Sequence, residues 1–350
     1  MLRALLLALL AATASAQPVP LDSLAQSYAE ANGLPSLVVA VSVGGERHVV
    51  GVGEVDGAAP DAHTRYEIGS ISKVLTALAL ADAVAGGEVE LTTPVEALLP
   101  DTLAVASSPA GPYRLVDLAT HTSGLPRLPV DLAMVPGFSL ADPYAGYGPD
   151  RLLRLLERVE IETAPGETYA YSNLGAGLLG YVLARHDGTT YEQAVRRRVL
   201  APLGLDETTL GVPEGARLAP AHGADGAAVP HWTWTDATAG AGGWRSTAGD
   251  LLTLAAAALS PSTSARPEAL ALSLAPQVQA REGVAVGLAW HLTPLGLQTM
   301  AWHNGAVGGS TAFVGAVPEA GVAVVVLTNR QADAKALGVD VLRRLLAAEE

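Results

Sequence analysis

The chain has 350 residues, of which 49% are hydrophobic, and its mean hydropathy is +0.30. This length and composition predict a large buried core in one domain with an inserted lobe, and they exclude a disordered protein. The formal net charge of −14 and the isoelectric point near 5.0 argue against a nucleic-acid partner. We interpret the densest basic run, Arg196 to Arg198, as a solvated helix face.

Residues 1–16 have the pattern of a secretory signal peptide. Arg3 precedes an apolar run, Ala4 to Ala12, that is too short to cross a bilayer, and Ala14-Ser15-Ala16 is a small-residue cleavage site. We expect cleavage near Ala16/Gln17, a mature single-domain chain 17–350 without a membrane span, and a secreted or periplasmic location. The chain has no cysteine, which excludes disulfides, lipoprotein anchoring, thiol catalysis and cysteine-based zinc sites.

The first predicted elements are a helix and a β-hairpin. Leu21 to Asn32 is amphipathic and closed by Gly33, and Ser36–Val43 and Arg47–Val52 are strand patterns on either side of a Gly-Gly turn. A second helix follows Glu67–Lys73, because alanine and leucine dominate from position 74 and no glycine or proline occurs before Gly86.

Ser70 and Lys73 lie three residues apart and therefore on one face of this helix, with Ser70 at its amino end among free N–H groups. A serine needs a neighbouring base to become a nucleophile, and a lysine serves only if burial lowers its pKa. The chain has two lysines and nineteen arginines. Because arginine cannot deprotonate, a lysine retained here favours the role of a base. By itself, the pair also fits a chance occurrence with Ser70 as a helix cap.

The middle of the chain, roughly residues 88–250, predicts a mostly helical lobe. Helices are expected at 151–159 and 174–184, and the aperiodic loop 126–149 is expected to form one wall of a cleft. His121 is a candidate base, although a histidine in a loop that ends a helix is more often structural. The tryptophans between residues 203 and 249 either pack loops or line a substrate groove.

The carboxyl-terminal part predicts a four-stranded meander and a final helix at 332–348. The expected strands are Val284–Leu292, Gln298–Trp302, Ser310–Val317 and Val322–Thr328, with a hairpin turn at 318–321. Strands at both ends of the chain with helices between them indicate an α+β fold, an α/β sandwich in which one antiparallel sheet is flanked by helices. A cleft is expected between this sheet and the helical lobe.

Two further segments carry chemistry. Tyr171 and Asn173 follow a Pro-Gly turn, and they can supply a proton-carrying phenol, if a nearby cation lowers its pKa, and an amide that holds a substrate carbonyl. A buried tyrosine and a helix-capping asparagine are the alternative. His303 enters a glycine-rich turn, where Gly305 permits close approach of a substrate and the N–H of Ala306 can join that of Ser70 in an oxyanion hole. The alternative is an ordinary hairpin.

Taken together, the three segments resemble, in order and spacing, the motifs of the serine β-lactamase and penicillin-binding superfamily. Flanking residues, such as 65–70 and 118–125, resemble its class C β-lactamase-related branch, which includes family VIII esterases and D-stereospecific peptidases. The resemblance spans Leu21 to Asn329. It implies the β-lactamase/transpeptidase-like fold and a mechanism in which Ser70 forms an acyl-enzyme, Lys73 takes its proton, and Tyr171 passes protons to the leaving group and later activates water.

The resemblance also implies that Asn173 and His303 orient the substrate and that the N–H groups of Ser70 and Ala306 bind the oxyanion. The chain departs from the usual Lys-Thr-Gly of the third motif, because it has His303-Asn304-Gly305. A histidine is mostly neutral near pH 7 unless a partner raises its pKa, and it becomes cationic as pH falls through that pKa. A substrate carboxylate therefore loses its usual cation, which favours esterase or D-peptidase activity over penicillin hydrolysis.

Two other functions remain open from the sequence: a class C-like β-lactamase or D-Ala-D-Ala carboxypeptidase, and a catalytically silent binding protein on the same scaffold. We expect a small-molecule or peptide substrate and no cofactor. The eight histidines include no His-Glu-x-x-His, so no zinc site is expected. The sequence predicts neither the acyl and leaving groups nor the oligomeric state.

Overall fold

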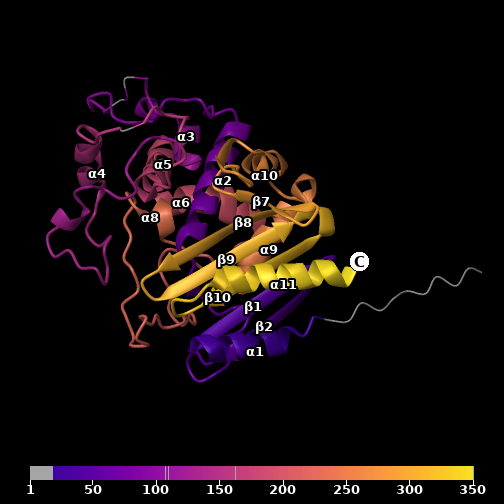
Figure 1. Cartoon of the computed structure of the whole chain (residues 1–350). Helices are drawn as coiled ribbons and strands as arrows, with labels where there is room; N and C mark the ends of the chain where they lie inside the picture. Colours follow the sequence, from indigo (N-terminus) through magenta and orange to yellow (C-terminus); the bar gives the residue numbers. More distant parts are fainter. Residues whose placement is uncertain (1–18, 107, 109, 162, 350) are drawn as a thin grey trace, which may run out of the picture.

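The structure is a computed structural model that describes residues 19–106, 108, 110–161 and 163–349. The predicted signal peptide lies outside this range. Strands from both chain ends form one eight-stranded antiparallel sheet, and most of the middle of the chain forms helices and long loops beside it (Figure 1). The fold expected from the sequence, an α+β arrangement with an antiparallel sheet and flanking helices, is confirmed.

The sheet has the order β2-β1-β10-β9-β8-β7-β6-β5. Its strands are β1 (Ser36–Val43), β2 (Glu46–Gly53), β5 (Val278–Arg281), β6 (Val284–Val286), β7 (His291–Leu295), β8 (Gln298–Val307), β9 (Ser310–Val317) and β10 (Val322–Thr328). A separate two-stranded ladder pairs β3 (Tyr66–Glu67) with β4 (Arg245–Ser246).

The central strands are buried on both faces, because each face has its own apolar cluster. In β10, Val322, Val324 and Val326 belong to one cluster, whereas Ala323, Val325 and Leu327 belong to the other. This alternation follows from the two-residue period of a strand. Helices α1 (Leu21–Asn32) and α11 (Ala334–Glu349) cover the first face, and α9 (Ala248–Leu259) covers the second (Figure 1).

Helix α2 (Ser72–Ala85) lies in the interior of the molecule, where the sheet side and the helical side meet. It is apolar on nearly every side and 11 of its 14 residues are buried. The other α-helices are α3 (Leu115–Ala119), α4 (Pro149–Leu156), α5 (Asn173–His186), α6 (Tyr191–Val195), α7 (Ala201–Leu203), α8 (Ala239–Gly242) and α10 (Pro267–Leu274).

Three expectations need correction. The strand predicted over 284–292 is two strands, because the backbone turns at Ala289, which has a φ of 64°, and Gly287 donates its N–H to the carbonyl of Trp290. Strand β8 continues through the third motif to Val307, so His303 lies within a strand rather than in a turn. Arg198 is only 4% exposed and pairs with carboxylates of Asp82, Glu88 and Asp187, so the basic run is not a uniformly solvated face.

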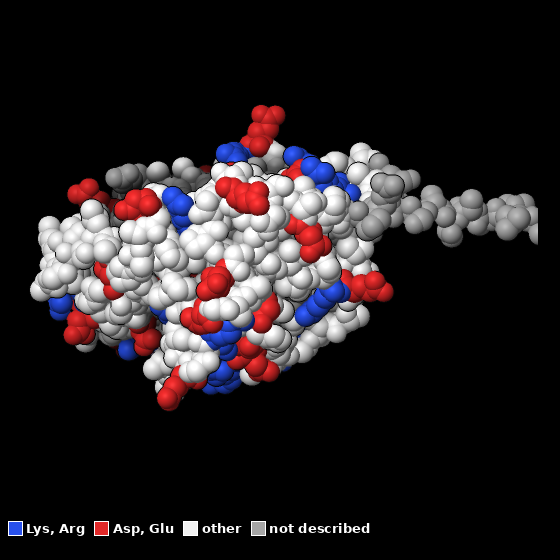
Figure 2. All heavy atoms as spheres, turned by 90° about the horizontal axis from the view of Figure 1, so that it is seen from below, with Lys and Arg blue, Asp and Glu red and all other residues white. Residues whose placement is uncertain are grey.

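Among the helices of the described range, none combines the length and the apolar character that crossing a membrane requires. On the face drawn in Figure 2, basic and acidic side chains are interspersed, and the basic ones do not gather into a continuous patch.

Candidate active site

Ser70 lies in a short 3₁₀ turn, Gly69–Ile71, directly before α2. Gly69 adopts a φ of 50°, which disfavours any residue with a side chain. A Cβ at this position would also lie 2.7 Å from the backbone nitrogen of Ala306 on β8. The glycine therefore lets the serine turn pack against β8, and this contact sets where Ser70 points.

Lys73 is in the first turn of α2 and its side chain is 2% exposed. Its Nζ lies 3.0 Å from Ser70 Oγ and 2.6 Å from the carbonyl oxygen of Ala241 in α8. Burial, reinforced by the positive charge of Arg127, holds the pKa of Lys73 well below its usual range. A neutral amine in contact with a serine hydroxyl is the arrangement that proton abstraction requires.

Tyr171 precedes α5, whose amino end is capped by the Ser172 hydroxyl, which accepts from the N–H of Gly175. The Tyr171 ring centroid lies 4.8 Å from Lys73 Nζ. Burial raises the pKa of Tyr171, and a hydrogen bond with the Ser70 side chain only partly opposes this. Arg127 is a nearby cation that acts to lower this pKa, as the sequence suggested, but desolvation outweighs its charge, so the pKa is raised overall and the phenol stays protonated at neutral pH.

Asn173 is the first residue of α5 and reaches the same cavity. Its Nδ2 donates to the hydroxyl of Tyr144 at 3.0 Å, which fixes the orientation of the amide. Its Oδ1 is buried and has no hydrogen-bond partner among the described residues. The helix cap is Ser172 rather than Asn173, so capping does not occupy the Asn173 side chain.

The third motif lies on β8 opposite the Ser70 turn. A Cβ on Gly305 would lie 1.9 Å from the carbonyl oxygen of Ile68 and 2.8 Å from the nitrogen of Ser70. Because Gly305 has no side chain, the turn that carries Ser70 can pack directly against β8. Val307 and Ser310 are the hydrogen-bonded pair that flanks a two-residue hairpin loop between β8 and β9. The next pair along the strands, Ala306 and Thr311, is therefore a non-hydrogen-bonded pair, in which each N–H points away from the partner strand. The Ala306 N–H accordingly faces the Gly69–Ser70 turn.

His303 is 1% exposed, and its Nδ1 lies 2.7 Å from the carbonyl oxygen of Asn304. Since a carbonyl only accepts, Nδ1 carries the proton and Nε2 presents a lone pair. Nε2 is buried without a partner in the described part of the chain. Burial, and then the charges of His291 and Lys73, lower the pKa of His303 well below its ordinary value. The ring is a neutral acceptor at physiological pH.

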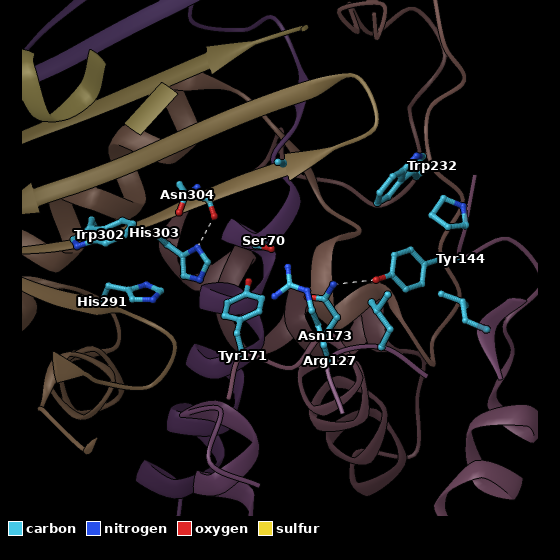
Figure 3. A pocket seen from close by; sticks show the side chains of 14 residues that line it. Ser70, Arg127, Tyr144, Tyr171, Asn173, Trp232, His291, Trp302, His303 and Asn304 are labelled. Atoms are coloured by element: carbon cyan, nitrogen blue, oxygen red, sulfur yellow. Dashed lines mark hydrogen bonds between the residues drawn. The ribbon is translucent and has the colours of Figure 1, made fainter. Parts of the chain in front are cut away.

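These side chains line a cavity of about 530 Å³ (Figure 3). The loop between residues 126 and 149 forms one wall, as its composition predicted. The lining residues are Ser70, Arg127, Leu128, Leu132, Pro143, Tyr144, Tyr171, Asn173, Trp232, His291, Trp302, His303, Asn304 and Ala306. Lys73 lies beneath this surface, in contact with Ser70.

The sequence did not single out three of the lining residues, Arg127, Tyr144 and His291. Tyr144 stacks on Trp234 with ring centroids 4.5 Å apart, and His291 stacks on Trp302 at 4.6 Å. Burial lowers the pKa of His291 to about 4. Arg127 follows directly after residues 118–125, which resemble the class C-related branch, and it lies in the loop expected to form a cleft wall. This position was the one signal in the sequence that could have indicated it.

His121, the other candidate base, packs against the Tyr171 ring. Their ring centroids are 4.2 Å apart, and His121 Nδ1 accepts the N–H of Ser172 at 3.2 Å. The residue has a φ of 61°, and it does not line the cavity. Its contacts position the Tyr171 loop.

One group in the described part of the chain has spacing compatible with a metal ion: Glu88, His186 and Asp187. The guanidinium of Arg198 already contacts both carboxylates. This group is therefore an ion-pair network in which arginine supplies the positive charge.

Comparison with known proteins agrees with this geometry. A sequence model of the Beta-lactamase family matches residues 21–349. The chain belongs to the Beta-lactamase family. A Beta-lactamase from Pseudomonas fluorescens is 26% identical over 88% of this chain and 92% of its own length. The crystal structure of a class C β-lactamase from Rhodobacter sphaeroides is 26% identical, covers 94% of this chain and 99% of its own, and superposes with a TM-score of 0.81.

A further relative is the D-alanyl-D-alanine-carboxypeptidase/endopeptidase AmpH of Escherichia coli K12, which is 30% identical over 51% of this chain. That match spans 46% of the relative's own length. Membership of this family makes the chain a serine hydrolase that acts through an acyl-enzyme. The resemblance to the class C-related branch inferred from the three motifs is confirmed, and a silent binding protein is not the function that the relatives support.

Proposed function

We propose that this chain is a secreted hydrolase of the esterase or D-peptidase type, which cleaves an ester or amide through an acyl-enzyme on Ser70. Lys73 takes the Ser70 proton as the carbonyl is attacked. The N–H groups of Ser70 and Ala306 stabilise the oxyanion, and the protonated Tyr171 delivers a proton to the leaving group and then activates water. Asn173 and His303 orient the substrate.

The observation that carries the proposal is the state of His303. A buried imidazole that presents a lone pair repels a carboxylate, whereas it accepts a hydrogen bond from a neutral donor. A substrate whose carboxylate must lie at the third motif is therefore disfavoured, and an uncharged ester or amide is not.

The apolar border of the cavity supports the same substrate class. Leu128, which is exposed, and Leu132 line the cavity from the loop between residues 126 and 149. With Tyr144 and Trp232, they offer apolar surface to an acyl or leaving group. The signal peptide pattern supports secretion.

A second candidate is a β-lactamase or D-Ala-D-Ala carboxypeptidase, which the names of the relatives favour. The two candidates differ in their rates with three substrates: p-nitrophenyl butyrate, nitrocefin and a peptide ending in D-Ala-D-Ala. We expect kcat/KM to be highest for the ester. If nitrocefin or the peptide exceeds the ester by tenfold or more, the second candidate replaces the first.

A further inference from the structure

Arg127 lines the cavity beside the nucleophile, with its backbone fixed by a hydrogen bond and its side chain exposed over the Tyr171 ring. Its carbonyl oxygen accepts the N–H of Asn173 at 2.8 Å, which ties the backbone to the start of α5. Its guanidinium carbon lies 5.2 Å from the centroid of the Tyr171 ring. Figure 3 shows Arg127 next to Tyr171, with Tyr144 and Trp232 on one side and His303 and His291 on the other.

This guanidinium has no anionic partner within the described structure. Most other arginines of the chain form ion pairs: those at positions 65, 114, 151, 158, 196, 197, 198, 217, 245, 266 and 344. Arg127 forms neither an ion pair nor a side-chain hydrogen bond with any residue that the structure describes. Its donors are therefore open to the cavity.

The cavity is otherwise free of charged side chains among its lining residues. None of the lining residues is acidic, although the chain as a whole carries a formal net charge of −14. Lys73 is buried and its pKa is lowered, whereas Lys335 lies over the Trp302 ring at the other end of the cavity and does not line it. Arg127 thus makes the region around Ser70 locally attractive to anions in a protein that repels them overall.

The two ends of the cavity differ in the polar groups that they offer to a substrate. Across Ser70 from Asn173 and Tyr144, His303 presents a lone pair, which is unfavourable for a carboxylate. On the side of Ser70 where Asn173 and Tyr144 lie, the guanidinium of Arg127 offers several N–H donors in the planar arrangement that matches a carboxylate. An anionic group of the substrate is therefore accommodated next to Arg127 and excluded next to His303.

We propose that Arg127 is a specificity-determining residue that binds a carboxylate of the substrate, so that the preferred ester or amide carries one negative charge placed on the Arg127 side of the cleaved bond. This inference rests on the proposed function and names its substrate class. Uncharged esters remain substrates, and a correctly placed carboxylate raises kcat/KM above theirs.

The experiment compares matched esters that differ by one carboxylate. On the acyl side, the pair is p-nitrophenyl valerate and mono-p-nitrophenyl glutarate. On the leaving side, it is phenyl butyrate and 3-carboxyphenyl butyrate. For each pair, the ratio of kcat/KM (carboxylate over neutral) is measured in wild type, Arg127→Gln and Arg127→Lys. Arg154→Gln is the control, because Arg154 is exposed outside the cavity and its loss changes the net charge equally.

We expect Arg127→Gln to lower the ratio of one pair by roughly tenfold and Arg127→Lys to restore part of it. Loss of the Arg127 charge also raises the pKa of Lys73, which slows both esters of a pair alike, and this common loss cancels in the ratio. The responding pair identifies the side on which the carboxylate lies. The wild-type ratio should also fall as salt is raised from about 0.05 to 0.5 M, because the contact is partly exposed. This salt series needs no variant, so it stands even if Arg127→Gln folds poorly.

Two results overturn the proposal: unchanged ratios in both pairs, or equal losses for neutral and charged esters, which would make Arg127 an electrostatic support for Lys73. An equal effect of Arg154→Gln would also overturn it, because net charge alone would then explain the ratio. If wild type hydrolyses none of the four esters, the proposed function itself fails, and this outcome is distinct from the others.

Discussion

Lys73 donates from Nζ to the carbonyl oxygen of Ala241 at 2.6 Å, and this contact holds the amine 3.0 Å from Ser70 Oγ. A neutral amine uses one N–H for the carbonyl and keeps its lone pair for the hydroxyl proton of Ser70. Burial lowers the pKa of Lys73, which makes the neutral form accessible, whereas burial raises the pKa of Tyr171. The two shifts assign the role of base to the lysine and that of proton donor to the phenol.

Replacing Lys73 by arginine should damage the enzyme nearly as much as replacing it by alanine, although arginine keeps the charge. A guanidinium does not deprotonate, and loss of a general base lowers the rate by about 10² to 10⁴. The measurement is kcat for p-nitrophenyl butyrate in both variants, with circular dichroism to verify folding. If Lys73→Arg retains most of the activity, Lys73 is an electrostatic support rather than a base.

The same burial predicts a gain in stability when the lysine is removed. Since the folded pKa is lowered, the unfolded chain binds a proton that the folded chain does not, from the lowered pKa up to the ordinary value of 10.5. At neutral pH, each unit by which the folded pKa falls below 10.5, counted no further than the working pH, costs about 1.4 kcal/mol of stability. Lys73→Met should therefore raise Tm while abolishing turnover.

The control for this change is Lys335→Met, at the other lysine of the chain. Burial also lowers the pKa of Lys335, but this lysine is only half-buried and its Nζ lies 3.6 Å from the centroid of the Trp302 ring, a favourable contact that its removal loses. Lys335→Met should therefore raise Tm less than Lys73→Met does. A Tm of Lys73→Met at or below that of wild type would show that the buried lysine is not destabilising.

The third motif predicts how substrate preference depends on pH and on one substitution. The sequence suggested that His303 becomes cationic as pH falls, but burial holds the pKa of His303 well below its ordinary value. The ratio of kcat/KM for nitrocefin to that for p-nitrophenyl butyrate should therefore stay constant from about pH 5.5 to 8. His303→Lys should raise this ratio about tenfold or more at pH 7, because a charge-assisted hydrogen bond contributes about 1.5 to 3 kcal/mol.

A ratio that rises steeply below pH 6.5 in wild type would mean that His303 titrates in this range and that the lone pair assigned to Nε2 is wrong. An unchanged ratio in His303→Lys, with folding intact, would show that residue 303 does not set the preference between these substrates.

Gly305→Ala should displace the turn that carries Ser70. The added Cβ would lie 1.9 Å from the carbonyl oxygen of Ile68 and 2.8 Å from the nitrogen of Ser70, so the serine turn must move away from β8. We expect a loss of kcat of at least about 10², because one misplaced oxyanion donor already costs that much, together with a lower Tm. Gly211→Ala, whose Cβ meets nothing within 4 Å, is the matched control. Full activity in Gly305→Ala would exclude the close contact between β8 and the turn.

The sequence predicted the sheet and the pairing of Ser70 with Lys73 because both depend on local periodicity: strands alternate every two residues, and positions 70 and 73 share one helical face. It assigned Gly305 to the close approach of a substrate and did not predict that Gly69 and Gly305 let the serine turn pack against β8, since this requirement arises from two segments that meet only in the folded chain. Arg127 was missed for the same reason. Its loop has no period, and only the tertiary contact with Tyr171 brings it to the cavity.

The central claim is that Ser70 carries the acyl group, and intact-mass spectrometry tests it most directly. Wild type and Ser70→Ala are mixed with an excess of p-nitrophenyl butyrate, quenched in acid within about a second and weighed, and ester turnover is followed in parallel. We predict an added mass equal to one butyryl group in wild type, located on the peptide that contains Ser70, and neither adduct nor turnover in Ser70→Ala. A butyryl adduct of equal yield in Ser70→Ala, or ester hydrolysis by that variant above about one percent of the wild-type rate, would contradict the account.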